Sequence, residues 1–171
     1  MNNLKKTLQL LIIAGAYMAS LSAIAHYNEL KELSPEVRAK EFSLSKKALA
    51  LNGYDPVAYF EEGPAKGSKK LSHTFKGVTY RFSSEENLEA FKQDPLAYEP
   101  QYGGWCAWAM YDGGGRTAPN PKRFKIIDNK LYVFYDGTFG NTLELWNKKA
   151  NDAALIGKAN YFWEDQVLGE H

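Results

Sequence analysis

The chain has 171 residues, a length typical of one domain, and its 44% hydrophobic content is enough for a buried core. The formal net charge of +1 argues against a nucleic-acid-binding protein, because such a protein needs a basic face. Cys106 is the one cysteine, which excludes an intramolecular disulfide and an all-cysteine zinc site.

The first 25 residues have the pattern of a signal peptide. Lys5 and Lys6 precede an apolar run at 10–21, and Ala23-Ile24-Ala25 is a small-x-small cleavage sequence. The apolar run is shorter than the ~20 residues that a membrane-spanning helix needs. We therefore expect export to the periplasm or the extracellular space, with cleavage after Ala25 and no membrane segment afterwards.

The segment that follows is expected to be a polar leader. Residues 26–45 are polar and charged, and they contain one helix signal: Ser34 as N-cap, Pro35 at the first helical position and Glu36 in the first turn. This pattern predicts a leader helix or linker over 26–45, followed by a single domain over 46–171.

The first part of that domain combines a capped turn with a hairpin. Asp55 is placed to cap a helical turn in which Pro56 takes the first position. Residues 71–75 and 78–82 read as two strands joined at Lys76-Gly77. Apolar residues alternate in the second strand, which predicts one buried face carrying Val78, Tyr80 and Phe82.

The second part alternates helix signals with another hairpin. Ser83 to Glu86 fits a capping box that opens a helix, and Asp128-Asn129 is expected to join strands at 124–127 and 130–135. The last third has helical patterning. Together these elements predict an α+β fold, a small compact domain with antiparallel β-hairpins packed against several short helices.

Cys106 lies in the most unusual stretch of the sequence, YGGWCAWAMY at 102–111. If this stretch is a strand, Cys106 and Met110 lie ~13 Å apart, too far to share a metal ion. If it is a helix, Met110 follows about one turn later and the two sulfurs are neighbours. Two alanines favour the helix, which Gly113-Gly114-Gly115 would end.

Three roles are open for this thiol. At the start of a helix, Cys106 would be favoured as the thiolate and could ligate a soft metal or react with oxidants. A free cysteine packed as a small hydrophobe against Trp105 and Trp108 is the simpler interpretation. Nucleophilic catalysis would need a base, and His73 is the one histidine within the proposed fold.

Four sequence blocks in order resemble the YHS-domain family, and more closely its exported single-domain branch. They are GYDPVAYF at 53–60, FKGVTYRFSS at 75–84, DPLAY at 94–98 and YGGWCA at 102–107. The resemblance covers roughly residues 46–163 and implies metal handling, because related YHS domains are thought to bind metal through cysteines. Those cysteine positions are Ala58, Ser83 and Asn87 in this chain, and His73 matches a family histidine.

Two functional hypotheses follow. The first is an exported YHS-like binding module that holds a soft metal ion, with copper as the candidate metal, through Cys106 with help from Met110 or His73. The second is a non-catalytic structural or interaction domain, in which Trp105, Trp108 and Tyr111 line a pocket for a small ligand or a protein partner. Neither hypothesis identifies a reaction.

Overall fold

The computed structural model describes residues 34–168, so the expected signal peptide at 1–25 lies outside the described residues. In this part of the chain six α-helices and three two-stranded antiparallel sheets form an α+β unit, as the sequence predicted. The unit begins at Ser34, ahead of the expected domain boundary at residue 46.

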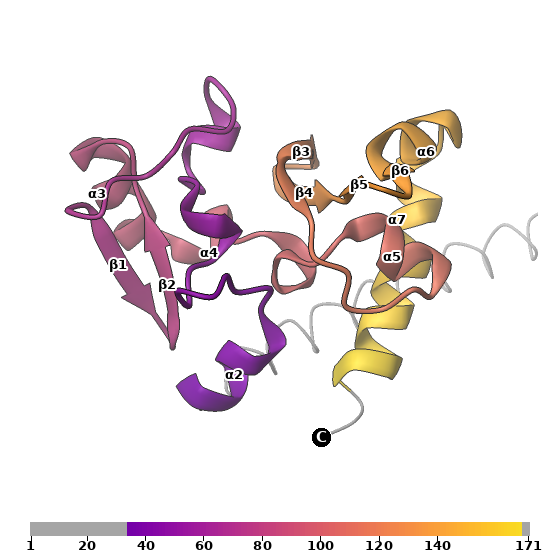
Figure 1. Ribbon diagram of the computed structural model, residues 1–171, viewed down its shortest axis with the longest axis horizontal. Helices are drawn as coiled ribbons and strands as arrows, with labels where there is room; N and C mark the ends of the chain where they lie inside the picture. The colour runs from indigo at the N-terminus through magenta and orange to yellow at the C-terminus, as the bar shows by residue number, and fades with distance from the viewer. Residues whose placement is uncertain (1–33, 169–171) are drawn as a thin grey trace, which may run out of the picture. The chain divides into compact units, whose positions relative to one another are not determined.

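The helices and strands are short and alternate along the chain. The first half contains α2 (Pro35–Glu41), the 3₁₀ turns η1 (Leu51–Gly53) and η2 (Ala58–Phe60), β1 (Ser72–Phe75), β2 (Val78–Arg81), α3 (Glu85–Gln93) and α4 (Pro95–Tyr98). The second half contains the 3₁₀ turn η3 (Gln101–Gly104), α5 (Ala107–Asp112), β3 (Asn120–Ile127), β4 (Lys130–Phe134), β5 (Asp136–Gly137), β6 (Gly140–Asn141), α6 (Thr142–Lys148), α7 (Asp152–Phe162) and the π-helical turn η4 (Trp163–Leu168). Figure 1 shows β1, β2 and α3 on one side of this unit, and α5, α6 and α7 on the other.

Both predicted hairpins are confirmed, and each turns through two residues of positive φ. Lys76 and Gly77, with φ of 44° and 84°, join β1 to β2. Asp128 and Asn129, with φ of 50° and 55°, join β3 to β4. Two-residue turns of this kind match the right-handed twist of the paired strands, and Gly, Asn and Asp adopt them at least cost.

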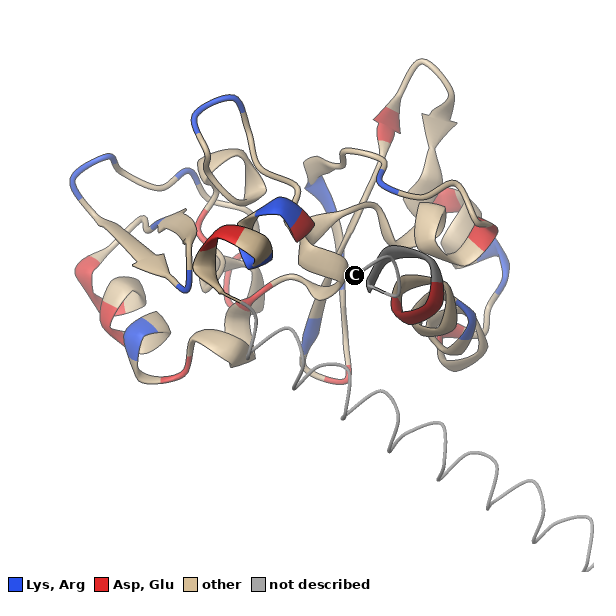
Figure 2. Ribbon diagram, turned by 90° about the horizontal axis from the view of Figure 1, so that it is seen from below, with Lys and Arg blue, Asp and Glu red and all other residues tan. Residues whose placement is uncertain are grey.

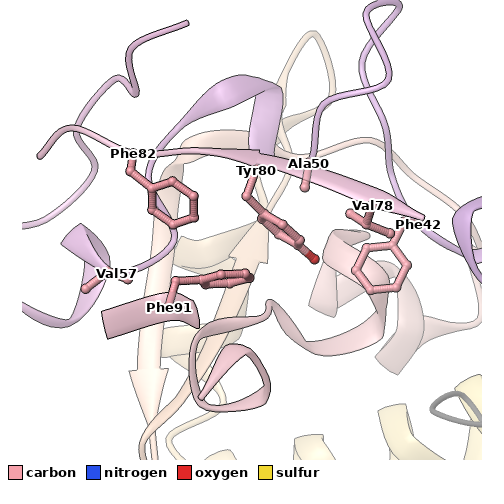
Figure 3. Packing of buried hydrophobic residues seen from close by; sticks show 7 residues of the cluster. All are labelled: Phe42, Ala50, Val57, Val78, Tyr80, Phe82 and Phe91. Atoms are coloured by element: carbon pink, nitrogen blue, oxygen red, sulfur yellow. The ribbon is translucent and has the colours of Figure 1, made fainter. Parts of the chain in front are cut away.

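A hydrophobic cluster lies between β2 and α3. Its fully or nearly buried members are Phe42, Ala50, Val57, Val78, Tyr80, Phe82 and Phe91 (Figure 3). Tyr80 of β2 and Phe82, the residue directly after β2, point toward Phe91, with ring centroids 4.7 and 5.1 Å from that of Phe91. The predicted alternation in β2 is therefore confirmed, and each buried ring stabilises the fold by about 1.5–3 kcal/mol.

A second cluster joins the 51–59 segment to β4. It comprises Leu51, Tyr54, Tyr59, Leu131 and Val133. The Tyr59 hydroxyl donates a 2.7 Å hydrogen bond to the carbonyl oxygen of Pro121, so this buried polar group is satisfied. Burial raises the pKa of Tyr59, which keeps the phenol neutral inside the cluster.

The start of α3 differs from the prediction by one residue. Ser84, not Ser83, is the N-cap, and its hydroxyl accepts a 3.1 Å hydrogen bond from the Asn87 amide. The reason is that the Ser83 hydroxyl donates to the Asp55 carboxylate at 2.6 Å. A contact between distant residues has displaced the capping box that the local sequence favoured.

The leader helix α2 is part of the folded unit. Its predicted cap is confirmed, since the Ser34 hydroxyl accepts from the Val37 amide at 3.4 Å. The helix also lies against the β1–β2 turn, where a Cβ at Gly77 would come within 2.1 Å of the Pro35 carbonyl oxygen. Only glycine allows this approach.

Arg38 connects α2 to the first hydrophobic cluster. Its guanidinium donates to Glu99 Oε2 at 2.5 Å, while the Tyr80 hydroxyl donates to Glu99 Oε1 at 2.5 Å. Arg38 also donates to the carbonyl oxygens of Phe75 and Lys76. Burial, and next the negative charge of Glu99, raise the pKa of Tyr80 well above its usual value. Arg38, Glu99 and Tyr80 thus form a buried and mutually satisfied polar group.

Replacing Arg38 by methionine tests this connection. We expect Arg38→Met to lower the free energy of unfolding by about 3–5 kcal/mol, because it leaves the Glu99 carboxylate buried without a cation. The Arg38→Met/Glu99→Gln double variant should recover part of that loss, since the amide still accepts from Tyr80. Urea unfolding measures both.

Arg123→Met is the matched control for this prediction. Its partner Asp136 lies in an exposed pair, with side chains 46% and 26% accessible, so we expect a change of at most about 1 kcal/mol. Equal losses in Arg38→Met and Arg123→Met would contradict the buried role of Arg38.

Candidate functional site

The expected helix is present from Ala107 to Asp112 (α5), as the two alanines indicated, but Cys106 itself has an extended backbone and precedes the first turn. Cys106 is the N-cap of α5, and Gly113, with φ of 83°, ends the helix in the left-handed conformation. The Met110 amide donates to the Cys106 carbonyl oxygen at 3.2 Å, so the two residues lie one turn apart. Both side chains are completely buried.

The Cys106 sulfur takes part in a closed set of hydrogen bonds. The Tyr135 amide donates to Sγ at 3.2 Å, and Sγ lies 3.4 Å from Thr142 Oγ1. The Thr142 hydroxyl donates its one hydrogen to the Tyr135 carbonyl oxygen at 2.9 Å. The Cys106 thiol is therefore the donor toward Thr142 Oγ1. The Cys106 thiol, the Tyr135 backbone and the Thr142 hydroxyl each donate one hydrogen bond and accept one within this ring, so the buried polar groups are satisfied.

This ring joins three elements. Cys106 precedes α5, Tyr135 lies between β4 and β5, and Thr142 begins α6. Cys106 also forms a parallel bridge with Val133, and its own amide donates to the Thr117 carbonyl oxygen at 3.0 Å. The thiol thus serves as a buried connection, and its helix-capping position carries no side-chain cap bond.

The two other residues predicted to help Cys106 hold a metal have different positions. Met110 is on the same helix and is buried with Cys106. His73 is on β1, paired with Tyr80, and its ring lies 6.3 Å from that of Phe91. Figure 1 shows β1 and α5 on opposite sides of the unit, so the fold does not bring His73 to the thiol. Within residues 34–168, no three His, Cys, Asp or Glu side chains meet in a group that could hold a metal ion.

Trp105, Trp108 and Tyr111 were predicted to line one pocket, but Trp105 contacts α2 whereas Trp108 and Tyr111 lie together on α5. Trp105 donates from Nε1 to the Glu41 carbonyl oxygen at 2.8 Å and so faces α2. Trp108 and Tyr111 lie together on α5, with ring centroids 5.2 Å apart, and both are half-buried. Lys158 of α7 lies over the Tyr111 ring at 4.8 Å. An aromatic surface of Trp108 and Tyr111 therefore remains, without Trp105.

Trp146 packs against the buried side of the aromatic surface formed by Trp108 and Tyr111. It is completely buried on α6, and the Tyr111 ring meets it edge-on at 6.4 Å. Its Nε1 donates to Asp152 at 2.7 Å, and Lys125 donates to the same carboxylate oxygen at 2.8 Å. Burial opposes ionisation of Asp152, but the hydrogen bonds from Lys125 and Trp146 lower its pKa. The start of α7 is thereby tied to α6 and β3.

A buried carboxylate forms a second polar centre that the sequence revealed only in part. Asp55 was predicted as a cap, and its Oδ1 indeed accepts from the amides of Val57 and Ala58 at 2.9 and 3.4 Å. Its Oδ2 accepts from the Ser83 amide, the Ser83 hydroxyl and Asn87 Nδ2 at 2.8, 2.6 and 2.7 Å. The Asp55 side chain is fully buried.

The positions where the family resemblance implies metal-binding cysteines meet at this carboxylate. Ala58, Ser83 and Asn87 all contribute a donor to Asp55. A soft metal ion needs thiolate, thioether or imidazole ligands, whereas these groups are an amide, a hydroxyl and a carboxamide that already bond to Asp55. The residues present at these positions do not fit a copper ion.

Comparisons of the chain with protein-family models, with curated proteins and with solved structures gave no match. Among residues 34–168, no helix is long and apolar enough to cross a membrane. The geometry of the site is therefore the basis of the functional proposal.

Asp55→Asn tests the buried carboxylate without changing its size. Either orientation of the new amide turns its NH2 group toward donors, so we expect the free energy of unfolding to fall by about 3 kcal/mol. Asp94→Asn is the matched control, because Asp94 also precedes a proline but is exposed and makes no side-chain cap bond. Thermal and urea unfolding give the comparison, and equal effects at both positions would contradict this role for Asp55.

A double-mutant cycle tests the ring at Cys106. We expect Cys106→Ala and Thr142→Val each to cost about 1–3 kcal/mol of unfolding free energy, because each leaves buried partners unsatisfied. In the double variant the two losses should be non-additive by about 1 kcal/mol. Additive losses in urea unfolding would show that the sulfur and the hydroxyl act independently.

Proposed function

We propose that the protein is an exported, YHS-like, non-catalytic binding module whose binding surface is formed by Trp108 and Tyr111. In this proposal Cys106 is a structural thiol and the protein is not an enzyme. The main support for this proposal is the difference in burial between Cys106, at the start of α5, and the two aromatic residues on that helix. The Cys106 sulfur is fully buried and bonded to Tyr135 and Thr142, while Trp108 and Tyr111 remain partly exposed beside a cation.

The position of the thiol supports a structural role. A nucleophile needs a base within hydrogen-bond reach, and the polar groups at Sγ are the Tyr135 amide and the Thr142 hydroxyl. His73, the histidine expected to serve as that base, instead contacts Phe91. A reaction at sulfur would also require the junction of α5, β4 and α6 to open.

The aromatic surface supports a binding role. Two neighbouring rings with an ammonium group over one of them offer an apolar face and a positive charge together. That combination suits a planar or aromatic group that carries a negative charge. Because the buried Trp146 packs against Tyr111, the Tyr111 ring is preorganised for binding.

Binding of an aromatic sulfonate dye tests the surface. We expect 1-anilinonaphthalene-8-sulfonate to bind the native protein saturably, and Trp108→Ala and Lys158→Gln to weaken binding several-fold without unfolding the chain. Tyr161→Ala is the matched control, because Tyr161 is an aromatic residue on α7 that is 68% exposed. Dye binding that does not depend on Trp108 would overturn the proposed surface.

Titration with Cu(I) separates this proposal from the copper hypothesis. If Cys106 is structural, Cys106→Ser and Met110→Leu should leave Cu(I) affinity unchanged while lowering stability. If both variants lose high-affinity Cu(I) binding while they remain folded by circular dichroism, Cys106 and Met110 are metal ligands and the proposal fails.

A further inference from the structure

Among the residues that the structure describes, Arg81 is the arginine without a carboxylate partner. Arg38 pairs with Glu99, Arg116 with Glu41 and Arg123 with Asp136. Within the described part of the chain, Arg81 has neither an ion pair nor a side-chain hydrogen bond, although it lies at the end of β2 beside ordered backbone. An arginine carries five N–H donors, so this guanidinium has its full donor capacity available.

Arg81 and Lys66 flank the same peptide unit. A Cβ at Gly53 would lie 3.6 Å from Arg81 Cδ and 3.9 Å from its Nη1. Lys66 Nζ donates to the Asn52 carbonyl oxygen at 3.0 Å and lies 4.0 Å from the centroid of the Tyr54 ring. Because residue 53 has no side chain, nothing from that position covers the two positive groups.

Backbone contacts hold the two cations in place. The Gly67 amide donates to the Gly53 carbonyl oxygen at 3.0 Å, directly after Lys66. Gly67 also packs so closely on β2 that a Cβ there would meet the Arg81 backbone at 2.4 Å. The loop that carries Lys66 is therefore fixed against the strand that carries Arg81, which makes the arrangement a preformed one.

Lys122 of β3 adds a third positive charge that acts on Lys66. It follows Pro121, whose carbonyl oxygen accepts from Tyr59, and Tyr59 packs with Tyr54 in the second hydrophobic cluster. Burial, and then the charges of Lys122 and Arg81, lower the pKa of Lys66. Both neighbouring charges thus act on Lys66, and no carboxylate in residues 34–168 forms an ion pair with any of the three cations.

The unpaired positive charges of Arg81, Lys66 and Lys122 are notable because the chain as a whole is almost neutral. With 21 basic and 20 acidic residues, the protein has almost one carboxylate for each cation. Figure 2 shows Lys and Arg on two neighbouring loops at one edge of the domain, in addition to those on helices and strands elsewhere. Unneutralised cations in a fixed group attract a counter-anion, and a guanidinium binds planar and tetrahedral oxyanions through two parallel bonds.

We propose that Arg81, Lys66 and Lys122 form a binding site for a phosphate-type oxyanion, supplied as the free ion or as the headgroup of an anionic lipid. Arg81 provides the bidentate contact, and the two ammonium groups provide charge from the neighbouring loop and strand. This site is separate from the aromatic surface of α5, so the two proposals stand independently.

Titration with inorganic phosphate at constant ionic strength tests the site. We expect saturable shifts of the Gly53 and Gly67 amide signals in NMR spectra of the protein. Arg81→Gln should weaken the apparent affinity by about tenfold or more, and Lys66→Gln and Lys122→Gln should each weaken it less. Lys148→Gln is the matched control, because Lys148 is exposed on α6 and should leave affinity unchanged.

A vesicle experiment distinguishes the two sources of the anion. If the natural ligand is a lipid headgroup, phosphatidylglycerol vesicles should bind the protein through Arg81 more strongly than free phosphate does, and phosphatidylcholine vesicles should not bind. If Arg81→Gln does not fold, the Lys66→Gln/Lys122→Gln double variant takes its place in both experiments. Binding that is equally weakened by Lys148→Gln, or that none of the three residues affects, would overturn the proposal.

Discussion

The buried carboxylate of Asp55 is the constraint on which the rest of the fold depends. A buried charge without a cation is costly unless hydrogen bonds satisfy it, and here donors come from the 57–58 turn, from Ser83 after β2 and from Asn87 on α3. The segment around Asp55 supplies both hydrophobic clusters, with Val57 in one and Tyr54 in the other. The turn, the end of β2 and the start of α3 must therefore form together with the two cores.

Local features of the fold were predictable because their causes are local. Turns at Lys76-Gly77 and Asp128-Asn129 depend on residues that tolerate positive φ, and the cap at Ser34 depends on a hydroxyl three residues before the amide it bonds. The start of α3 was wrong by one residue because the deciding partner of Ser83 is Asp55, 28 positions earlier. A local sequence pattern shows which nearby residues could cap a helix, but a hydrogen bond to a distant residue can decide which of them does so.

The candidate site could be predicted only in part, for the same reason. The helix at Cys106 followed from its alanines and glycines, but the fate of the sulfur depended on Tyr135 and Thr142, 29 and 36 positions later. The polar composition of residues 26–45 suggested a leader outside the domain. Arg38 is buried nevertheless, because its partner Glu99 lies 61 positions along the chain. A polar residue in a sequence is informative about burial only once its partner is known.

The same argument explains why an almost neutral chain can carry a local group of cations, as in the proposed anion site. A net charge of +1 describes the sum over the chain and argues against a broad basic face, but it says nothing of which cations have partners. Folding pairs Arg38, Arg116 and Arg123 with carboxylates, and it places Arg81 and Lys66 on either side of the Asn52–Gly53 peptide. Since Coulomb attraction between exposed charges fades beyond about 10 Å at moderate salt, an approaching anion responds to this local excess and not to the sum. The pairing pattern, which only the fold determines, is therefore the property on which the proposed anion site around Gly53 rests.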